Sequence, residues 1–242
     1  LISKRRPIGS CPGHSARAEA TGQITTNQLD VTATATREST PIILFFQVSL
    51  FTGEVVFGAE KTAGSTEALI GSGANITING GGSANVSATS TDTANPTVVN
   101  ASISPFNIGA VSANAEIASN TSASISGHVD AGSVSISATA NKTADADTFM
   151  VQIGILNLDG VALGGIDDEL PDDLPISIIP TFDTITVAVA GGDTDAFIGG
   201  GADIHTDLGL SLTATTPTNL ASATLDSVGA NFVAVSGSGN RF

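Results

Sequence analysis

Apolar and small polar residues alternate along most of the chain from residue 16 onward. Between residues 66 and 89, Ile76 and Ile78 form one alternating pair, Val86 and Ala88 form another, and glycines separate them. A period of two bounded by glycine is typical of β-strands joined by tight turns. No stretch of a dozen residues keeps the 3.6-residue period of a helix, so we predict an all-β chain.

Three kinds of sequence element recur. The first is IGSGANI at Ile70–Ile76, which returns as IGGGADI at Ile198–Ile204 and in weaker forms at 123–129 and 18–24. The second is an apolar-small-Ala-Thr block at Val31–Thr34, Val86–Thr89, Ile136–Thr139 and Leu212–Thr215. The third is an alternating run broken by glycine, expected at Val48–Gly58, Ile103–Ala113, Val151–Val161 and Leu225–Val235. Internal repetition of this kind indicates a repetitive β architecture.

The spacing of the second element predicts the fold. Its copies start 86 − 31 = 55, 136 − 86 = 50 and 212 − 136 = 76 residues apart. We predict residues 18–242 to be a single parallel β-solenoid (β-helix) of about four repeats, with coils about 4.8 Å apart and like residues stacked on like. A right-handed coil is favoured for parallel crossovers. A β-sandwich is the alternative, although sandwiches do not usually repeat internally and this chain has no Trp.

An insertion at 167–183 accounts for the longest interval. Pro171, Pro175 and Pro180 exclude a central strand there. Its acidic residues are a candidate ligand-binding loop and a second candidate calcium site: Asp167, Asp168, Glu169, Asp172 and Asp173.

The net charge of −15 and the pI of about 4.1 disfavour a nucleic-acid partner, which needs a basic stripe. An acidic surface suits an extracellular medium. Basic residues gather at the start, where Lys4, Arg5, Arg6 and Arg17 precede any acidic residue. We interpret residues 1–17 as a terminal arm, linker or processing remnant, with docking on an acidic neighbouring copy as the sharper alternative.

The longest apolar run, Ile42–Phe51, is too short to span a bilayer. We therefore expect no transmembrane span and predict a buried strand. In an assembly, Ile42, Leu44 and Phe46 are expected inside the coil or at a joint between copies.

Candidate chemistry is sparse. Asp193, Asp195, Asp203 and Asp207 accompany glycine-rich turns that resemble calcium-binding loops, and solvated turn aspartates are the alternative interpretation. His14, His128 and His205 are far apart in sequence, and Tyr and Trp are absent. We therefore expect no catalytic site, no enzyme activity and no certain cofactor beyond possible calcium.

The IGxGAxI and VSAT/LTAT blocks, with an SVGA run ending at Ala230, resemble the repeats of large bacterial filamentous adhesins of the filamentous-haemagglutinin-like and leukotoxin-like kind. The resemblance spans roughly residues 18–237. It implies a parallel β-helix displayed outside the cell or on its surface.

Two functions follow as hypotheses. The first is a non-enzymatic structural subunit of an extracellular fibre or surface adhesin, assembled from copies of itself by head-to-tail stacking of strand edges. The alternative is a monomeric adhesive module that recognises host or matrix ligands through a groove or through the 167–183 loop.

Overall fold

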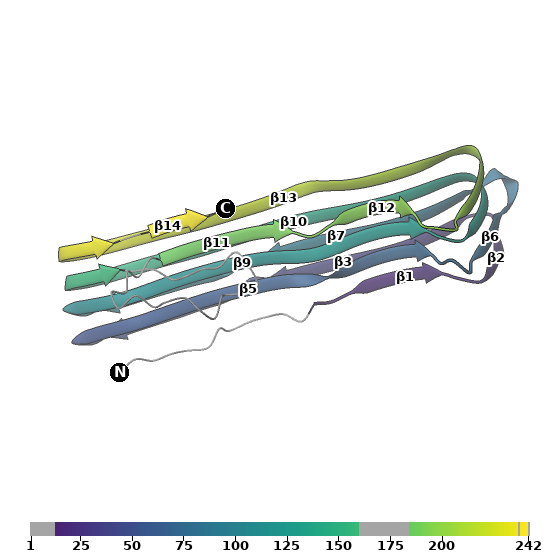
Figure 1. Ribbon diagram of the computed structural model, residues 1–242. Coiled ribbons are helices and arrows are strands. Elements are labelled where there is room, and N and C mark those ends of the chain that lie inside the picture. The colour runs from purple at the N-terminus through teal and green to yellow at the C-terminus, as the bar shows by residue number, and fades with distance from the viewer. Residues whose placement is uncertain (1–12, 160–183, 237, 242) are drawn as a thin grey trace.

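The computed structural model describes residues 13–159, 184–236 and 238–241. These residues are almost all in β-strands, and every strand pairing among them is parallel. Figure 1 shows long, gently curved strands arranged in two layers, with both layers ordered from the first repeat to the last. Parallel pairing throughout differs from a sandwich built of antiparallel hairpins.

The strands follow the chain as four repeats. The first contains β1 (Ala16–Ala20), β2 (Gln23–Thr26), β3 (Leu29–Ser39) and β4 (Ile42–Val48). The second contains β5 (Phe51–Ile70), β6 (Asn75–Ile78), a 3₁₀ turn at Asn79–Gly81, β7 (Ser83–Ala94) and β8 (Thr97–Ile103). The third contains β9 (Phe106–Ile125) and β10 (His128–Asp159). The fourth contains β11 (Thr184–Gly191), β12 (Thr194–Ile198), β13 (Asp203–Ser236) and then β14 (Ser238–Arg241).

One layer contains β1, β5, β9 and then β11 with β12 (Figure 1). The other contains β3 and β4, then β7 and β8, then β10 and β13, and each repeat crosses to it at a corner such as residues 71–74. The end of β10 leaves the second layer, because Leu156 to Asp159 pair with Phe106 to Gly109 of β9. Each repeat therefore passes along one layer, turns at the corner and passes back along the other.

Copies of the second sequence element lie directly on one another, as predicted. In the weaker copies of the first element only the last residues pair as predicted, because Ile125 and Ala20, and not Ala123 and Ala18, are in register with Ile70. We call residues paired in register from successive repeats a column. One column contains Ala20, Ile70, Ile125 and Ile198, and another contains Ile24, Ile76, Val129 and Ile204. A third contains Val31, Val86, Ile136 and Leu212. The periodic apolar residues are thus the inward-facing positions of the repeats.

The third sequence element was aligned wrongly in its last two copies. Val48 and Ile103 do pair, but their column continues through Ile153 and Ala230 instead of Val151 and Leu225. The glycines of this element do not divide strands in the described chain, because Gly154 lies within β10 and Gly229 within β13. In the first two copies the break falls elsewhere, after Val48 and after Ile103.

The interior contains two clusters of small apolar side chains. The cluster near the corner is centred on Ile70, Ile76 and Ile136, all fully buried. The second lies toward the opposite end and includes Val98, Val111 and Ile117. Burying one Val or Ile side chain stabilises the fold by about 1.5–3 kcal/mol, so these columns supply the main driving force.

A buried polar layer separates the two clusters. Its main column is Arg37, Asp92 and Lys142, which alternates positive, negative and positive charge between successive repeats. The Arg37 guanidinium donates to Asp92 Oδ1 at 2.7 Å. The hydroxyls of Ser90 and Ser119 donate to Asp92 Oδ2 at 3.0 and 2.6 Å. The carboxylate is therefore satisfied on both oxygens.

Lys142 completes the layer from the next repeat. Its Nζ donates to the carbonyl oxygens of Ser119, Gly191 and Gly192 at 3.0, 2.8 and 2.6 Å. Burial lowers the pKa of the Lys142 ammonium, and the nearby charge of Asp92 opposes that shift. Gly192 has φ of +93°, a conformation that glycine adopts without strain and that lets its carbonyl face the ammonium.

The corner is built from backbone packed on backbone. The N–H groups of Ser126 and His128 each donate at 2.9 Å, to the carbonyls of Ile70 and Ala74. A Cβ on Gly127 would lie 2.5 Å from the Gly71 carbonyl oxygen, so a larger residue does not fit. The close turn fixes the starting point of β10 at His128.

The prediction that the run Ile42–Phe51 is buried was wrong. Ile42, Leu44, Phe46 and Val48 alternate on the outer face of β4 and are 69, 73, 69 and 64% exposed. The inner positions between them pack against the second apolar cluster through Ile43 and Phe45.

The chain leaves and rejoins the same layer around the predicted insertion. Asp159 pairs with Gly109, and Ile185 pairs with Ser112. Only Ala110 and Val111 of β9 lie between these two pairing positions. The insertion at 167–183 itself lies outside the described residues.

Candidate functional site

The last repeat leaves one side of its strands unpaired among the described residues. β12 pairs only with β9, and β13 pairs only with β10. Leu212 is 43% exposed, although Val86 and Ile136 in the same column are fully buried. Leu210 of β13, which is in register with the buried Val134, is also exposed. This end of the structure, which we call the open end, presents core side chains together with free backbone hydrogen-bonding groups.

One short strand already pairs where a further repeat would stack on the open end. β14 pairs with Thr184–Val187 of β11, on the side away from β9. The column of Ala16 in β1 runs through Thr66 and Thr121 to Thr194, the first residue of β12. β14 thus covers β11, whereas β1 has the register to cover β12. The two short strands would therefore lie end to end in a further repeat, without competing for the same positions.

The outer side of β4 and its neighbours forms a second exposed feature, the apolar face. Its columns are Leu44, Val99 and Phe149, then Phe46, Ala101, Val151 and Val228, then Val48, Ile103 and Ile153. The three sequence-predicted assembly residues of β4, Ile42, Leu44 and Phe46, belong to this side of the sheet. Contiguous exposed apolar residues of this kind mark a contact surface.

The four predicted calcium ligands are spread over the last repeat. Asp193 lies in the turn between β11 and β12, where its carbonyl accepts from the Thr121 N–H at 2.9 Å. Asp195 lies within β12 and pairs in register with Ser122. Asp203 and Asp207 lie in β13. Of the four, only Asp203 belongs to a group of three or more possible metal ligands among the described residues.

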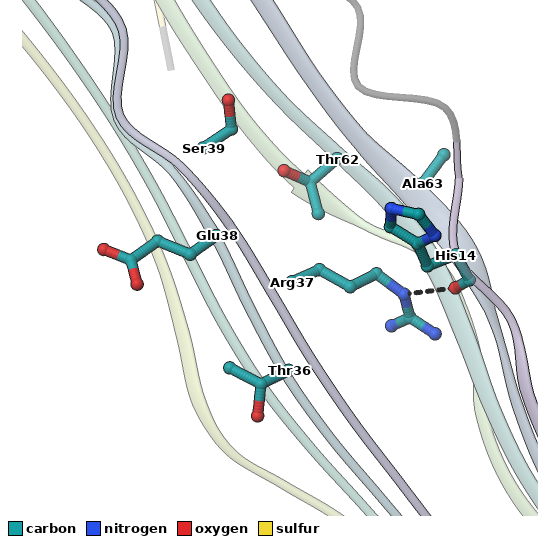
Figure 2. A pocket seen from close by; sticks show the side chains of 7 residues that line it. All are labelled: His14, Thr36, Arg37, Glu38, Ser39, Thr62 and Ala63. Carbon is teal, nitrogen blue, oxygen red and sulfur yellow. Dashed lines mark hydrogen bonds between the residues drawn. The ribbon is translucent and has the colours of Figure 1, made fainter.

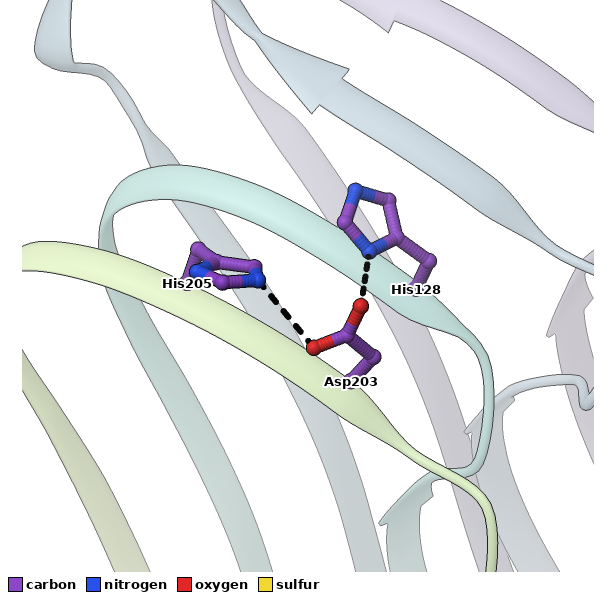
Figure 3. Close-up of side chains that lie close together, drawn as sticks. All are labelled: His128, Asp203 and His205. Carbon is purple, nitrogen blue, oxygen red and sulfur yellow. Dashed lines mark hydrogen bonds and ion pairs between the residues drawn. The ribbon is translucent and has the colours of Figure 1, made fainter.

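That group was missed from the sequence because the histidines are far apart along the chain. His128 and His205 lie on either side of the Asp203 carboxylate (Figure 3). His128 Nδ1 is 3.0 Å from Asp203 Oδ2, and His205 Nε2 is 3.1 Å from Asp203 Oδ1. The signal that finds it is the HVD block at 128–130 aligned with the DIH block at 203–205.

A small pocket lies beside the buried polar layer. Figure 2 shows Arg37 reaching toward the backbone of His14, whose carbonyl oxygen accepts from Nε at 2.7 Å. The cavity of about 170 Å³ is smaller than the roughly 300–1,000 Å³ typical of small-molecule sites. Its shape indicates a gap at the edge of the first repeat and not a substrate cavity.

Two further predicted sets cannot be placed. The basic residues Lys4, Arg5 and Arg6 lie outside the described residues. The acidic residues Asp167, Asp168, Glu169, Asp172 and Asp173 do as well.

No helix of the described residues has the length and apolar character needed to cross a membrane. Comparisons with protein-family models, with curated proteins and with solved structures find no match for this chain.

Proposed function

We propose that this chain is a β-solenoid and a structural subunit of an extracellular fibre or surface adhesin, in which copies add head to tail at the open end. Its role is non-enzymatic. Assembly extends the backbone ladders of one copy with those of the next.

The pairing pattern supports the solenoid. Each strand pairs in parallel with its counterpart one repeat later, and the repeats follow one another in chain order within both layers. The chain also rejoins the same layer after residues 160–183, as a solenoid with a side insertion does.

One observation carries the head-to-tail proposal: β14 and the β1 of a second copy can pair side by side with the last repeat without overlapping. β14 occupies the positions opposite β11, and β1 of a following copy has the register for the positions opposite β12. The following β3 then lies against β13. A heterologous contact of this kind leaves a new open end and propagates.

The side chains at such a joint are compatible. In the same register, Val31 of the following copy stacks on Leu212, and Ala33 stacks on Ala214. The charge column ends in Asn219, which pairs with Lys142. An incoming Arg37 therefore meets an uncharged amide instead of a like charge.

The cell-surface part of the proposal depends on the resemblance of the repeats to filamentous adhesins. The acidic composition supports the same setting.

The test compares two lysine substitutions on one edge strand. Leu212→Lys places a charge on the inward side of β13, where a second copy would bury it. Thr213→Lys places the same charge on the outward side, where it stays in solvent. We expect wild type and Thr213→Lys to form filaments in negative-stain micrographs at high concentration, and Leu212→Lys to remain monomeric by sedimentation velocity.

Circular dichroism melts check that both variants fold. A wild-type protein that stays monomeric over the whole accessible concentration range would refute the assembly. Equal filament formation by the two variants would show that the open end is not the joint.

The apolar face favours the second candidate function, an adhesive module that binds an apolar partner surface. Ile103→Lys separates the two, because residue 103 is exposed on the apolar face in β8, which pairs with β4 and β10 of the same copy and lies outside the proposed joint. Loss of adhesion with intact filaments would assign adhesion to this face, whereas unchanged adhesion would exclude it.

A further inference from the structure

Two short blocks with reversed order come into register at the start of β10 and β13. β10 begins His128-Val129-Asp130, and β13 begins Asp203-Ile204-His205. Asp203 pairs with His128, and His205 pairs with Asp130. Each histidine therefore has a carboxylate in the neighbouring repeat. Val129 and Ile204, between them, point inward to the corner cluster.

The three closest groups converge on a small volume at the surface. Nδ1 of His128, Nε2 of His205 and the Asp203 carboxylate all lie within 4.8 Å of one another. The two imidazole rings are 5.8 Å apart and tilted by 57° (Figure 3). The side chains are 35, 67 and 64% exposed, so an ion has open access from solvent.

The separations suit metal coordination. Two ligand atoms each about 2.1 Å from a metal lie about 3 Å apart at an angle of 90° and about 3.4 Å apart at the tetrahedral angle that Zn²⁺ prefers. The two nitrogen–oxygen distances of 3.0 and 3.1 Å lie at the short end of that range. Two imidazole nitrogens with one carboxylate are ligands that first-row transition metals prefer, whereas calcium takes oxygen ligands.

The scaffold holds these groups in place before any ion arrives. His128 starts β10 directly after the tight corner at Gly127, where its N–H donates to the Ala74 carbonyl at 2.9 Å. Asp203 is held likewise, because its N–H donates to the Gly127 carbonyl at 3.2 Å. Side chains on rigid strands lose less freedom on binding than side chains on loops.

We propose that His128, Asp203 and His205 form a binding site for a divalent first-row transition metal such as Zn²⁺. Water completes the coordination, and Asp130 stands next to His205 in register as a further oxygen donor. The ion joins the third and fourth repeats at the corner. The site shares only Asp203 with the calcium set expected from the sequence.

The experiment is a calorimetric titration of the untagged full chain with Zn²⁺ at pH 7.5, below the concentration at which it assembles. We expect one Zn²⁺ per chain and no comparable heat with Ca²⁺. The melting temperature should rise with Zn²⁺, because the ion binds the folded state, and should return to its starting value with chelator.

Histidine variants locate the site. His128→Gln and His205→Gln should each weaken Zn²⁺ binding at least about tenfold. His14→Gln is the matched control, because it removes the third histidine, which lies beside Arg37 and away from the corner. It should bind as wild type does. All three changes are at exposed or partly exposed positions, and melts without metal verify that each variant folds.

The result that overturns the proposal is equally direct. Absence of Zn²⁺ heat, or unchanged affinity in His128→Gln and His205→Gln, would show that the groups only exchange hydrogen bonds. A similar loss in His14→Gln would indicate nonspecific binding. Neither outcome decides head-to-tail assembly, which is measured separately with the Leu212→Lys and Thr213→Lys variants.

Discussion

At the scale of single residues, stacking in register sets a rule for charged groups. Parallel strands in register place equivalent side chains about 4.8 Å apart, so a buried charge repeated in every copy would face itself. The polar layer avoids this by placing Arg37, Asp92 and Lys142 in successive repeats. Opposite charges with satisfied hydrogen bonds make burial tolerable, and they also penalise any shift of register.

Removing one member of this column should be costly. Arg37→Ala leaves Asp92 buried without its strongest partner and also frees the carbonyls of His14 and Ser65, to which the guanidinium donates. We expect a loss of about 3–5 kcal/mol in the free energy of unfolding. The measurement is urea denaturation followed by circular dichroism.

Arg17→Ala is the control for the same change at the surface. Arg17 pairs with Glu67 at 3.0 Å, but its side chain is 55% exposed. An exposed pair contributes little to stability, so Arg17→Ala should lower the free energy of unfolding far less than Arg37→Ala does. If the two alanine variants were equally stable, the polar layer would not be a stabilising part of the fold.

The polar column could have been found from the sequence. Arg37, Asp92 and Lys142 are 92 − 37 = 55 and 142 − 92 = 50 residues apart, the same intervals as the VSAT copies. The histidine cluster was harder to predict, because register shifts in β13 and the insertion obscure the interval from 128 to 203.

At the scale of elements, the sequence predicted which motifs stack better than it predicted where strands begin and end. The isoleucines flanking the glycine-rich corner are distinctive, so the columns of the two strong copies were predicted correctly. The third element has no comparable landmark: its third copy was misaligned by two residues, which keeps the same side chains facing inward, and its fourth by five, which does not. Neighbouring strands also hold glycine in extended conformation, so Gly154 within β10 ends no strand.

The apolar run of β4 was misassigned for a related reason. A continuous run of apolar residues is the usual signature of a strand covered on both sides. Here one side of the run packs inward and the other forms the apolar face. Hydrophobicity alone does not distinguish a second layer of the same chain from a surface for a partner.

The insertion should be removable without harming the strands around it. We suggest replacing residues 160–184 by Ala-Val, to match Ala110 and Val111, which lie in β9 between the partners of Asp159 and Ile185. β10 would then continue directly into β11, as β5 and β9 run without interruption at the same columns. Shortening the connection should raise stability by about 2 kcal/mol through loop-closure entropy.

Thermal unfolding and micrographs check this prediction. Filaments formed by the shortened chain would agree with stacking through β13 and β14. If adhesion to host or matrix material fell while filaments persisted, the 167–183 loop would be the ligand-binding element. A shortened chain that fails to fold would mean that the layer is not continuous across this point.

At the scale of the whole molecule, the net charge of −15 opposes assembly of identical copies. If free strand edges and apolar columns drive stacking, salt should favour it by screening this repulsion. The Debye length falls from about 30 Å at 0.01 M to about 8 Å at 0.15 M ionic strength. We therefore expect the critical concentration for filaments, measured by sedimentation, to fall over this range. A basic arm at Lys4–Arg6 that latches onto an acidic neighbour predicts the opposite sign, because salt weakens such an attraction. A critical concentration that rises with salt, and loses that dependence when residues 1–12 are removed, would assign the joint to the arm in place of the open end.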